Sequence, residues 1–110
     1  MILPNAENAY IDRSKIVDYL MSISHPDGRS KARFFMQFGF RVERWQELAD
    51  AIRRVGVSNP VVTVVQSEYG ARYTIDGLVQ CPDGRAPKVR TVWIVESENA
   101  APRLITAHPL

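Results

Sequence analysis

The sequence predicts an α+β domain in which three N-terminal helices pack on one face of a four-stranded antiparallel sheet. In the first half of the chain, apolar residues recur every three or four positions, which is the period of an amphipathic helix. In the second half, segments rich in β-branched residues alternate between apolar and polar side chains, as strands do. Short turns separate these segments, so consecutive strands are expected to pair antiparallel, with the helices covering one face.

Each predicted helix is bounded by residues that favour a helix end. Asp12 and Ser30 can cap the first two helices, because their side-chain oxygens accept hydrogen bonds from free backbone N–H groups. Gly39 and Gly56 are expected to end the second and third helices. The three helices are predicted over residues 13–22, 31–38 and 42–55.

The predicted strands are short and are connected by turn-forming sequences. The segment PDGR at 82–85 is a strong turn signal that makes the second and third strands a hairpin, and Gly77 is expected to mark a β-bulge. Both faces of the last two strands are half apolar, so the sequence does not show which face the helices cover. The uncovered face is the expected location of a groove. The four strands are predicted over residues 60–66, 71–80, 87–96 and 103–110.

The composition is that of a globular protein, and residues 1–110 are expected to form a single domain. The 14 Lys and Arg residues against 12 Asp and Glu residues give a net charge of +2, which is too small to indicate nucleic-acid binding by itself. The single cysteine, Cys81, excludes a disulfide framework and, with two histidines, cannot complete a zinc site. No apolar run is long enough to span a membrane and no secretion signal is visible, so a cytoplasmic location is expected.

Four groups of basic, hydroxyl and aromatic residues are candidate site residues, although no strong short motif is present. One group lies on the turn before the second helix, where cations stand near a helix N-terminus that suits an anion. Another lies in an otherwise apolar strand, where Arg90 either pairs with Asp76 or Glu96 or points into a groove. The predicted catalytic residues are His25, Lys31, Arg90 and Thr91. The predicted substrate-binding residues are Arg29, Ser30, Arg72, Tyr73, Thr106 and His108.

Together these are the residue types that metal-independent RNA cleavage needs. A base removes the proton of the 2′-hydroxyl, cations neutralise the phosphate, and an acid protonates the leaving 5′-oxygen. Lys31 and Arg90 would neutralise the scissile phosphate, His25 would transfer the proton, and no cofactor is expected. The same residues also have structural interpretations, as a solvent-facing turn, a cross-strand ion pair, packed aromatic rings and an exposed terminus.

Three segments resemble a family of small uncharacterised bacterial domains, and the resemblance extends over nearly the whole chain. They are LPNAENA at 3–9, HPDGRSKARFF at 25–35, and KVRTVWIVES with APRLITAHPL within 88–110. Members of the family occur in toxin–antitoxin-like gene pairs and as C-terminal domains of polymorphic toxins. The layout is similar to that of the barnase/EndoU/colicin/RelE-type ribonuclease toxins, a likeness at the level of the fold. The family more often has Tyr where this chain has His108, which weakens the case that this residue is essential.

The leading hypothesis is therefore a toxin-like, metal-independent ribonuclease that acts on RNA and is neutralised by a cognate antitoxin. Two other classes fit the same residues. A non-catalytic module would bind a protein through the open sheet face. A nucleotidyl- or ADP-ribosyl-transferring effector is disfavoured because the sequence has no Gly-rich nucleotide loop. The sequence leaves the RNA target and the oligomeric state undetermined.

Overall fold

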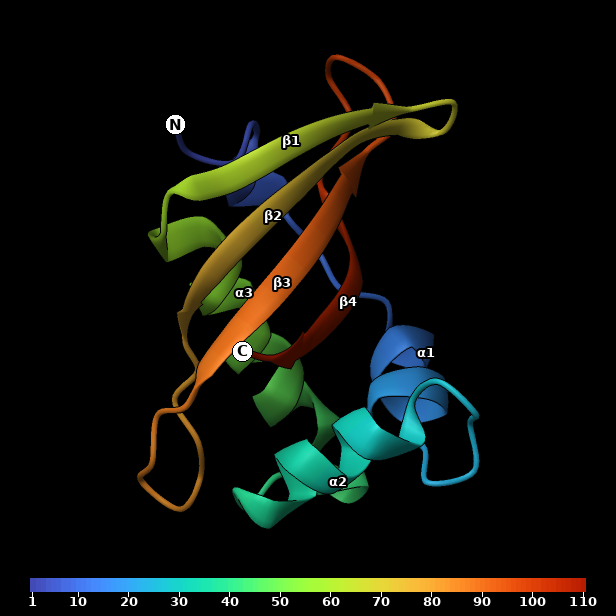
Figure 1. The fold of residues 1–110 in the computed structure, drawn as a ribbon, viewed down its shortest axis with the longest axis vertical. Helices are drawn as coiled ribbons and strands as arrows, with labels where there is room; N and C mark the ends of the chain where they lie inside the picture. Colours follow the sequence, from blue (N-terminus) through green and yellow to red (C-terminus); the bar gives the residue numbers. More distant parts are fainter.

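Figure 1 shows the fold in a computed structural model that describes residues 1–110. Three helices precede a four-stranded antiparallel sheet, so the predicted α+β class is confirmed. Each strand neighbours the next one in the chain, which makes the sheet a simple meander with β1 and β4 at its edges. The strands are β1 (Val61–Ser67), β2 (Gly70–Leu78), β3 (Lys88–Val95) and β4 (Arg103–Pro109).

The helical half combines short and long elements. The first helix, α1 (Arg13–Lys15), continues as the π-helical segment η2 (Ile16–Leu20). The 3₁₀ turns η1 (Ala6–Asn8) and η3 (Val42–Arg44) precede α1 and α3. None of these helices combines the length and the apolar character of a membrane-spanning segment. The two longest helices are α2 (Arg29–Gln37) and α3 (Trp45–Ser58).

The first helix begins after Asp12 and the second ends before Gly39, as predicted, whereas the predicted ends at Ser30 and Gly56 are wrong. The side chains of Asp12 and Ser30 make no capping hydrogen bond. The imidazole of His25 serves the turn before α2 instead, because its ring nitrogen accepts the backbone N–H groups that approach the helix. Gly56 lies inside α3 rather than ending it. A glycine is needed at this position because a Cβ would collide with the ring of Trp93. Glycine is used here for close packing, not for a turn.

The β-bulge predicted at Gly77 is absent. Gly77 pairs in regular register with Val89 on β3. Its missing Cβ makes room for the side chain of Asn59, whose amide donates a hydrogen bond to the carbonyl of Val55 in α3. The irregular pairings of the sheet lie between β1 and β2 and between β3 and β4.

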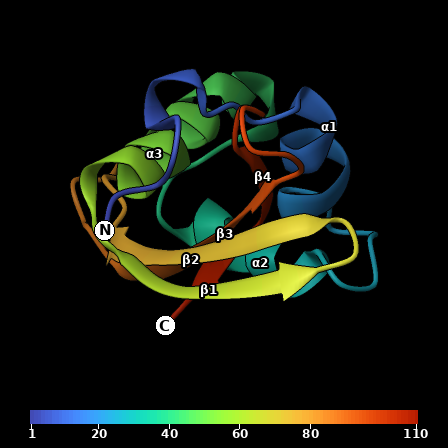
Figure 2. The same cartoon turned by 90° about the horizontal axis from the view of Figure 1, so that it is seen from above.

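The helices cover one face of the sheet, and the hydrophobic core fills the space between the two layers. Figure 2 shows α1 and α3 on the same side of the strands. Within this layer α3 packs on β2 and β3, while α1 and α2 contact β4. The core is continuous, so the two layers hold each other in a fixed orientation. The largest fully buried side chains include Trp93, Phe35, Ile16, Leu20, Leu48, Ile52, Ile75 and Leu104.

The opposite side of the sheet, which we call the open face, carries charged and hydroxyl side chains. Strand pairing arranges them in three rows that run across β2, β3 and β4. Neighbouring rows are two residues apart on β3, which is roughly 7 Å. The rows are Arg72–Ile94–Arg103, Thr74–Val92–Thr106 and Asp76–Arg90–His108.

Candidate functional site

Three side chains, those of His25, Lys31 and Thr106, meet around Tyr19 at the edge of the sheet formed by β4; we call these four residues the tyrosine cluster. The hydroxyl of Tyr19 lies 3.1 Å from Oγ1 of Thr106. The ring of His25 approaches the Tyr19 ring edge-on, with 5.1 Å between the ring centres. The ammonium of Lys31 lies 5.1 Å from the centre of the same ring. Residues from η2, the following turn, α2 and β4 thus converge on one phenol group.

The turn between η2 and α2 holds His25 and Lys31 in place. Nδ1 of His25 accepts hydrogen bonds from the backbone N–H groups of Asp27 and Gly28, at 3.0 and 3.1 Å. The ammonium of Lys31 donates to the carbonyl of Asp27 at 3.0 Å. Gly28 is required here because a Cβ would collide with the carbonyl of Tyr19. The HPDG sequence therefore forms a tight turn that positions the side chains of His25 and Lys31 next to the Tyr19 ring.

The hydrogen bonds of His25 also determine its chemistry. A nitrogen that accepts two N–H groups carries no proton, so the neutral ring of His25 holds its proton on Nε2. The imidazole is then a hydrogen-bond donor through Nε2, while its basic lone pair is occupied by the turn. This arrangement suits His25 for holding a phosphate oxygen better than for removing a proton.

The environment of Tyr19 favours loss of the phenol proton. Partial burial raises the pKa of Tyr19, but hydrogen bonding with Lys31 and Thr106, followed by the positive charges of Lys31 and Lys15, outweighs this effect. The net result is a pKa below the ordinary value of 10.0. The ammonium of Lys15 lies 5.2 Å from the centre of the Tyr19 ring, so two cations lie close to the phenol. A tyrosine in this setting is a stronger acid than a free one.

The third row of the open face forms a second polar group beside the tyrosine cluster. Nε and one terminal nitrogen of Arg90 donate to the two carboxylate oxygens of Asp76, each at 2.9 Å. Hydrogen bonding to Arg90 lowers the pKa of Asp76 below its ordinary value, and Asp76 raises the pKa of Arg90 in turn. Asp76, not Glu96, is therefore the acidic partner that Arg90 needs.

His108 on β4 pairs with Arg90 on the neighbouring strand β3. It lies two residues beyond Thr106, on the same face of β4. Its Nδ1 lies 3.1 Å from the carbonyl oxygen of Pro109. Because a carbonyl only accepts, Nδ1 carries the proton in this bond, and Nε2 is free to act as a base. His108 and the hydroxyl of Tyr19 are thus two proton-transfer groups at neighbouring rows of one surface.

Two predicted site residues lie on the other side of the sheet, and their predicted roles need correction. Thr91 is 0% exposed; its hydroxyl donates to the carbonyl of Ile75 at 2.8 Å and accepts Nε1–H of Trp93 at 2.9 Å. Tyr73 packs against the hydrophobic core opposite Trp93. Both face the helices because they alternate with the open-face residues of their strands. Thr91 therefore has no contact with a substrate, and Tyr73 is no platform for a base on the open face.

The remaining predicted residues form no hydrogen bond or ring contact with the tyrosine cluster. Arg29 and Ser30 lie exposed in the first turn of α2, and their side chains make no hydrogen bond within the protein. Arg72 lies in the first row of the open face, away from Arg90 in the third. The structure therefore brings together His25, Lys31 and Thr106, places Arg90 and His108 beside them, and leaves Arg72 as a separate element.

A comparison with known families covers nearly the whole chain. One family model matches residues 2–110. The chain belongs to the family DUF6883, a domain of unknown function. This agrees with the sequence resemblance to a family of small uncharacterised domains. No curated protein matches the chain.

The DUF6883 domain shares its fold with a chain from a solved complex. That structure is a contact-dependent growth inhibition toxin–immunity protein complex from Klebsiella pneumoniae 342. The two chains superpose with a TM-score of 0.74 and are 18% identical, and the match covers 92% of this chain and 99% of the other. At this level of identity the likeness establishes a common fold.

The residue at the centre of this site, Tyr19, is not among the site residues that the sequence predicts. The three-residue spacing of Tyr19 from Ile16 is that of a core residue on an amphipathic helix, so periodicity alone predicts a structural role for its side chain. The ring does contact the core, but its hydroxyl reaches the edge of β4. A usable signal was Lys15, four residues before Tyr19, since residues at this spacing share one face of a helix.

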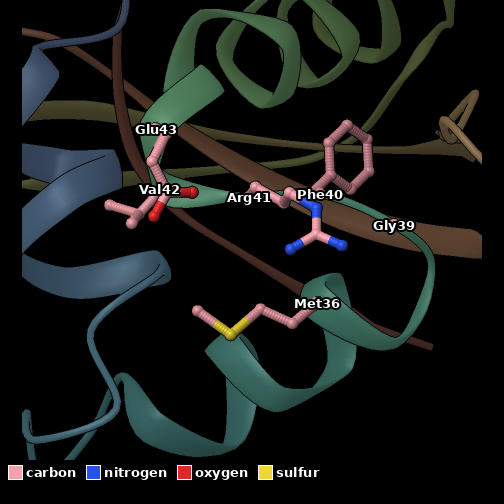
Figure 3. A pocket seen from close by; sticks show the side chains of 6 residues that line it. All are labelled: Met36, Gly39, Phe40, Arg41, Val42 and Glu43. Carbon is pink, nitrogen blue, oxygen red and sulfur yellow. The ribbon is translucent and has the colours of Figure 1, made fainter.

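A hollow of about 260 Å³ lies apart from the tyrosine cluster and the third row of the open face. Figure 3 shows it between the end of α2, which carries Met36, and the following segment, which carries Arg41 and Val42. None of the sequence-predicted site residues lines it. The domain also has no group of three His, Cys, Asp or Glu side chains that could hold a metal ion. The polar chemistry is concentrated on the open face and the edge formed by β4.

Proposed function

We propose that the chain is a bacterial toxin that cleaves RNA in the cytoplasm without a metal ion. The observation that carries this proposal is the tyrosine cluster, in which the phenol of Tyr19, with a lowered pKa, lies near the ammonium groups of Lys31 and Lys15 at the border of the open face. The fold likeness to a contact-dependent growth inhibition toxin–immunity protein complex supports a toxic role. It also supports a cognate immunity protein as the partner that protects the producing cell.

The proposed reaction begins with the nucleophile that RNA supplies itself. Nε2 of His108 removes the proton of a 2′-hydroxyl, and the 2′-oxygen attacks the adjacent phosphorus. A P–O2′ bond forms and the P–O5′ bond breaks, which leaves a 2′,3′-cyclic phosphate. Arg90, held in a fixed orientation by Asp76, faces His108 across the sheet and neutralises the phosphate as negative charge develops.

Tyr19 completes the reaction by giving its proton to the leaving 5′-oxygen. The phenolate that remains is stabilised by the ammonium groups of Lys31 and Lys15 and by the hydroxyl of Thr106. The Nε2–H group of His25 is free to donate to a phosphate oxygen. The base, His108, lies on the row next to that of Thr106, which the acid Tyr19 contacts, and neighbouring rows are roughly 7 Å apart. Acid and base can therefore act on opposite sides of one phosphorus. General acid–base catalysis of this kind contributes about 10²- to 10⁴-fold in rate.

The first test is inducible expression in a bacterial host, with growth, total RNA and protein level followed together. The wild type is expected to arrest growth and to fragment RNA, whereas Tyr19→Phe is expected to do neither at equal protein level. Tyr73→Phe, which removes a hydroxyl on the helix-facing side, is the matched control and keeps the toxicity.

The chemistry is tested on purified protein with a synthetic RNA in the presence of a metal chelator. Cleavage that continues under these conditions and leaves 2′,3′-cyclic phosphate ends is the expected result. Growth arrest with intact RNA would contradict the proposal and favour a transferring effector. Normal growth at confirmed expression of the wild type would favour a binding module.

A further inference from the structure

A hollow lies on the open face beside the tyrosine cluster. It is a hollow of about 230 Å³ at the end of the sheet where β1 turns into β2. Arg72 and Arg103 pair with Ile94 from the two sides, so two guanidinium groups flank one apolar residue in the first row. We call it the first-row hollow. Its lining residues are Lys15, Tyr69, Arg72, Ile94, Arg103 and Ile105.

The charges of the first-row hollow are only partly compensated. Arg103 donates to the carboxylate of Glu96 at 2.8 Å, which fixes its position and raises its pKa. Arg72 and Lys15 form no ion pair with any carboxylate of the chain. Two free cations that converge on a concave surface attract an anion, and the fork of an arginine matches the oxygens of a phosphate.

The rest of the lining is apolar or aromatic and suits a flat ring. Ile94 is only 4% exposed and, with Ile105, supplies an apolar surface between the cations. Tyr69 is 71% exposed and lies at the turn between β1 and β2. An exposed tyrosine beside free cations is the combination that binds an unpaired base together with its phosphate. The chemistry of the hollow therefore fits a nucleotide unit of a single strand.

The position of the hollow connects it to the proposed reaction site. Lys15 lines the hollow and also lies 5.2 Å from the centre of the Tyr19 ring, so one ammonium belongs to both places. The first row is two residues from the row that ends in Thr106, which is roughly 7 Å on β3. This separation is close to that of neighbouring phosphates in an extended single strand.

We propose that the first-row hollow is a binding subsite for a nucleotide of single-stranded RNA next to the cleaved phosphate. Arg72 and Lys15 bind its phosphate, and Tyr69 stacks on its base. The choice of RNA as the ligand rests on the proposed ribonuclease function. The subsite holds the strand so that the following phosphate reaches Tyr19 and His108.

The test separates binding from cleavage by the use of a 2′-O-methyl RNA hexamer, which has no free 2′-hydroxyl to attack. Fluorescence anisotropy of the labelled hexamer gives Kd for the full chain. Arg72→Ala is expected to raise Kd about tenfold, the effect of losing one good contact. Tyr69→Ala is expected to raise it at least about fivefold, through lost stacking. The salt dependence of log Kd becomes shallower by about 0.7 in Arg72→Ala, since one phosphate contact is lost.

Two controls make the result specific. Arg54→Ala removes an exposed arginine from α3, on the other side of the sheet, and is expected to change Kd less than about twofold. His108→Ala is expected to abolish cleavage of unmodified RNA while the methylated hexamer still binds. Thermal unfolding shows whether each variant is folded, and Arg72 and Tyr69 are exposed enough for substitution without loss of the core.

The outcomes distinguish the subsite from the proposed function. Binding of the hexamer that depends on Arg72 and Tyr69, without cleavage of unmodified RNA, would support the subsite and contradict the ribonuclease. Cleavage with equal Kd for the wild type and both hollow variants would overturn the subsite alone. An equal loss of affinity in Arg54→Ala would also overturn it, because the binding would then follow net charge.

Discussion

The two faces of β3 show how one strand supplies both the core and the site. On the side that faces the helices, Trp93 and Thr91 are fully buried, and the indole N–H of Trp93 donates a hydrogen bond to the hydroxyl of Thr91. On the open face, Arg90 is partly exposed and is held by Asp76 at the surface. Residues that follow each other in the sequence thus have opposite roles, because the side chains of a strand alternate between its faces.

Two threonines illustrate what the difference teaches. Thr91 and Thr106 have the same hydroxyl group, and each lies in a strand. The Thr91 hydroxyl is hydrogen-bonded to Ile75 and Trp93 inside the core. The Thr106 hydroxyl instead bonds to Tyr19 at the edge of the sheet. The face of the sheet, and not the residue type, decides which of them can take part in chemistry.

The largest expected effect is the loss of the Tyr19 hydroxyl. Tyr19→Phe keeps the ring in the core but removes the proton donor, so the rate of RNA cleavage should fall at least about 100-fold. Stability should change by only about 1 kcal/mol, since one hydrogen bond to Thr106 is lost. Cleavage kinetics and thermal unfolding check both values. A matching loss of activity in Tyr73→Phe would show that the comparison of the two faces is mistaken.

The two threonines provide the second test. Thr91→Val leaves the carbonyl of Ile75 and the indole N–H of Trp93 without their buried partner, so it should lower the free energy of unfolding by about 1–3 kcal/mol. Its cleavage rate below the unfolding temperature should stay near that of the wild type. Thr106→Val should show the reverse, with a lower rate and near-normal stability. Denaturant unfolding and cleavage assays on both variants measure the contrast.

The third prediction concerns the pH dependence of cleavage. Tyr19 must be protonated to act as the acid, so the rate should fall as the pH rises through the lowered pKa of Tyr19, below 10.0. Lys31→Met removes a positive charge that lowers this pKa, so the falling limb should move to higher pH. Lys88→Met removes a lysine outside the tyrosine cluster and serves as the control. Rate profiles and ultraviolet titration of the tyrosinate test the shift, and an unmoved limb in Lys31→Met would argue against Tyr19 as the acid.

The smallest effect is expected at the ion pair of the third row. The pKa of Asp76 is lowered in the folded state, so its stabilising contribution is present above the unfolded value near 3.8 and is lost as the pH falls through the folded value. Asp76→Asn should therefore unfold a few degrees below the wild type near neutral pH, with the difference disappearing in acid. Glu43→Gln removes an exposed carboxylate that has no ion-pair partner and serves as the control. Thermal melts across this pH range measure the effect.

Local sequence patterns predicted the elements well and the site only in part. The hairpin turn at 82–85 and the strand around Trp93 were recognisable because turn chemistry and β-branched periodicity act over a few residues. Gly56 and Gly77 were misinterpreted because they serve contacts with Trp93 and Asn59, which are distant in the sequence. Close packing across the fold leaves no local pattern.

The candidate site shows the same division. Lys31 was a sequence candidate because a cation beside a helix N-terminus breaks a local preference. Arg90 was a candidate because a charge in an apolar strand needs a partner, and Asp76 was among the partners considered. Tyr19 was missed, because its hydroxyl bonds to Thr106, a residue 87 positions further along the chain.

The sequence by itself determined the α+β class, the order of helices and strands, and the inventory of cationic and hydroxyl groups. These follow from periodicity and composition, which are properties of neighbouring residues. Only the tertiary structure decided which face of the sheet is open, which threonine is buried, and that Tyr19 joins His25, Lys31 and Thr106. Those outcomes depend on how the helices dock on the sheet, and docking is set by the packing of the whole core.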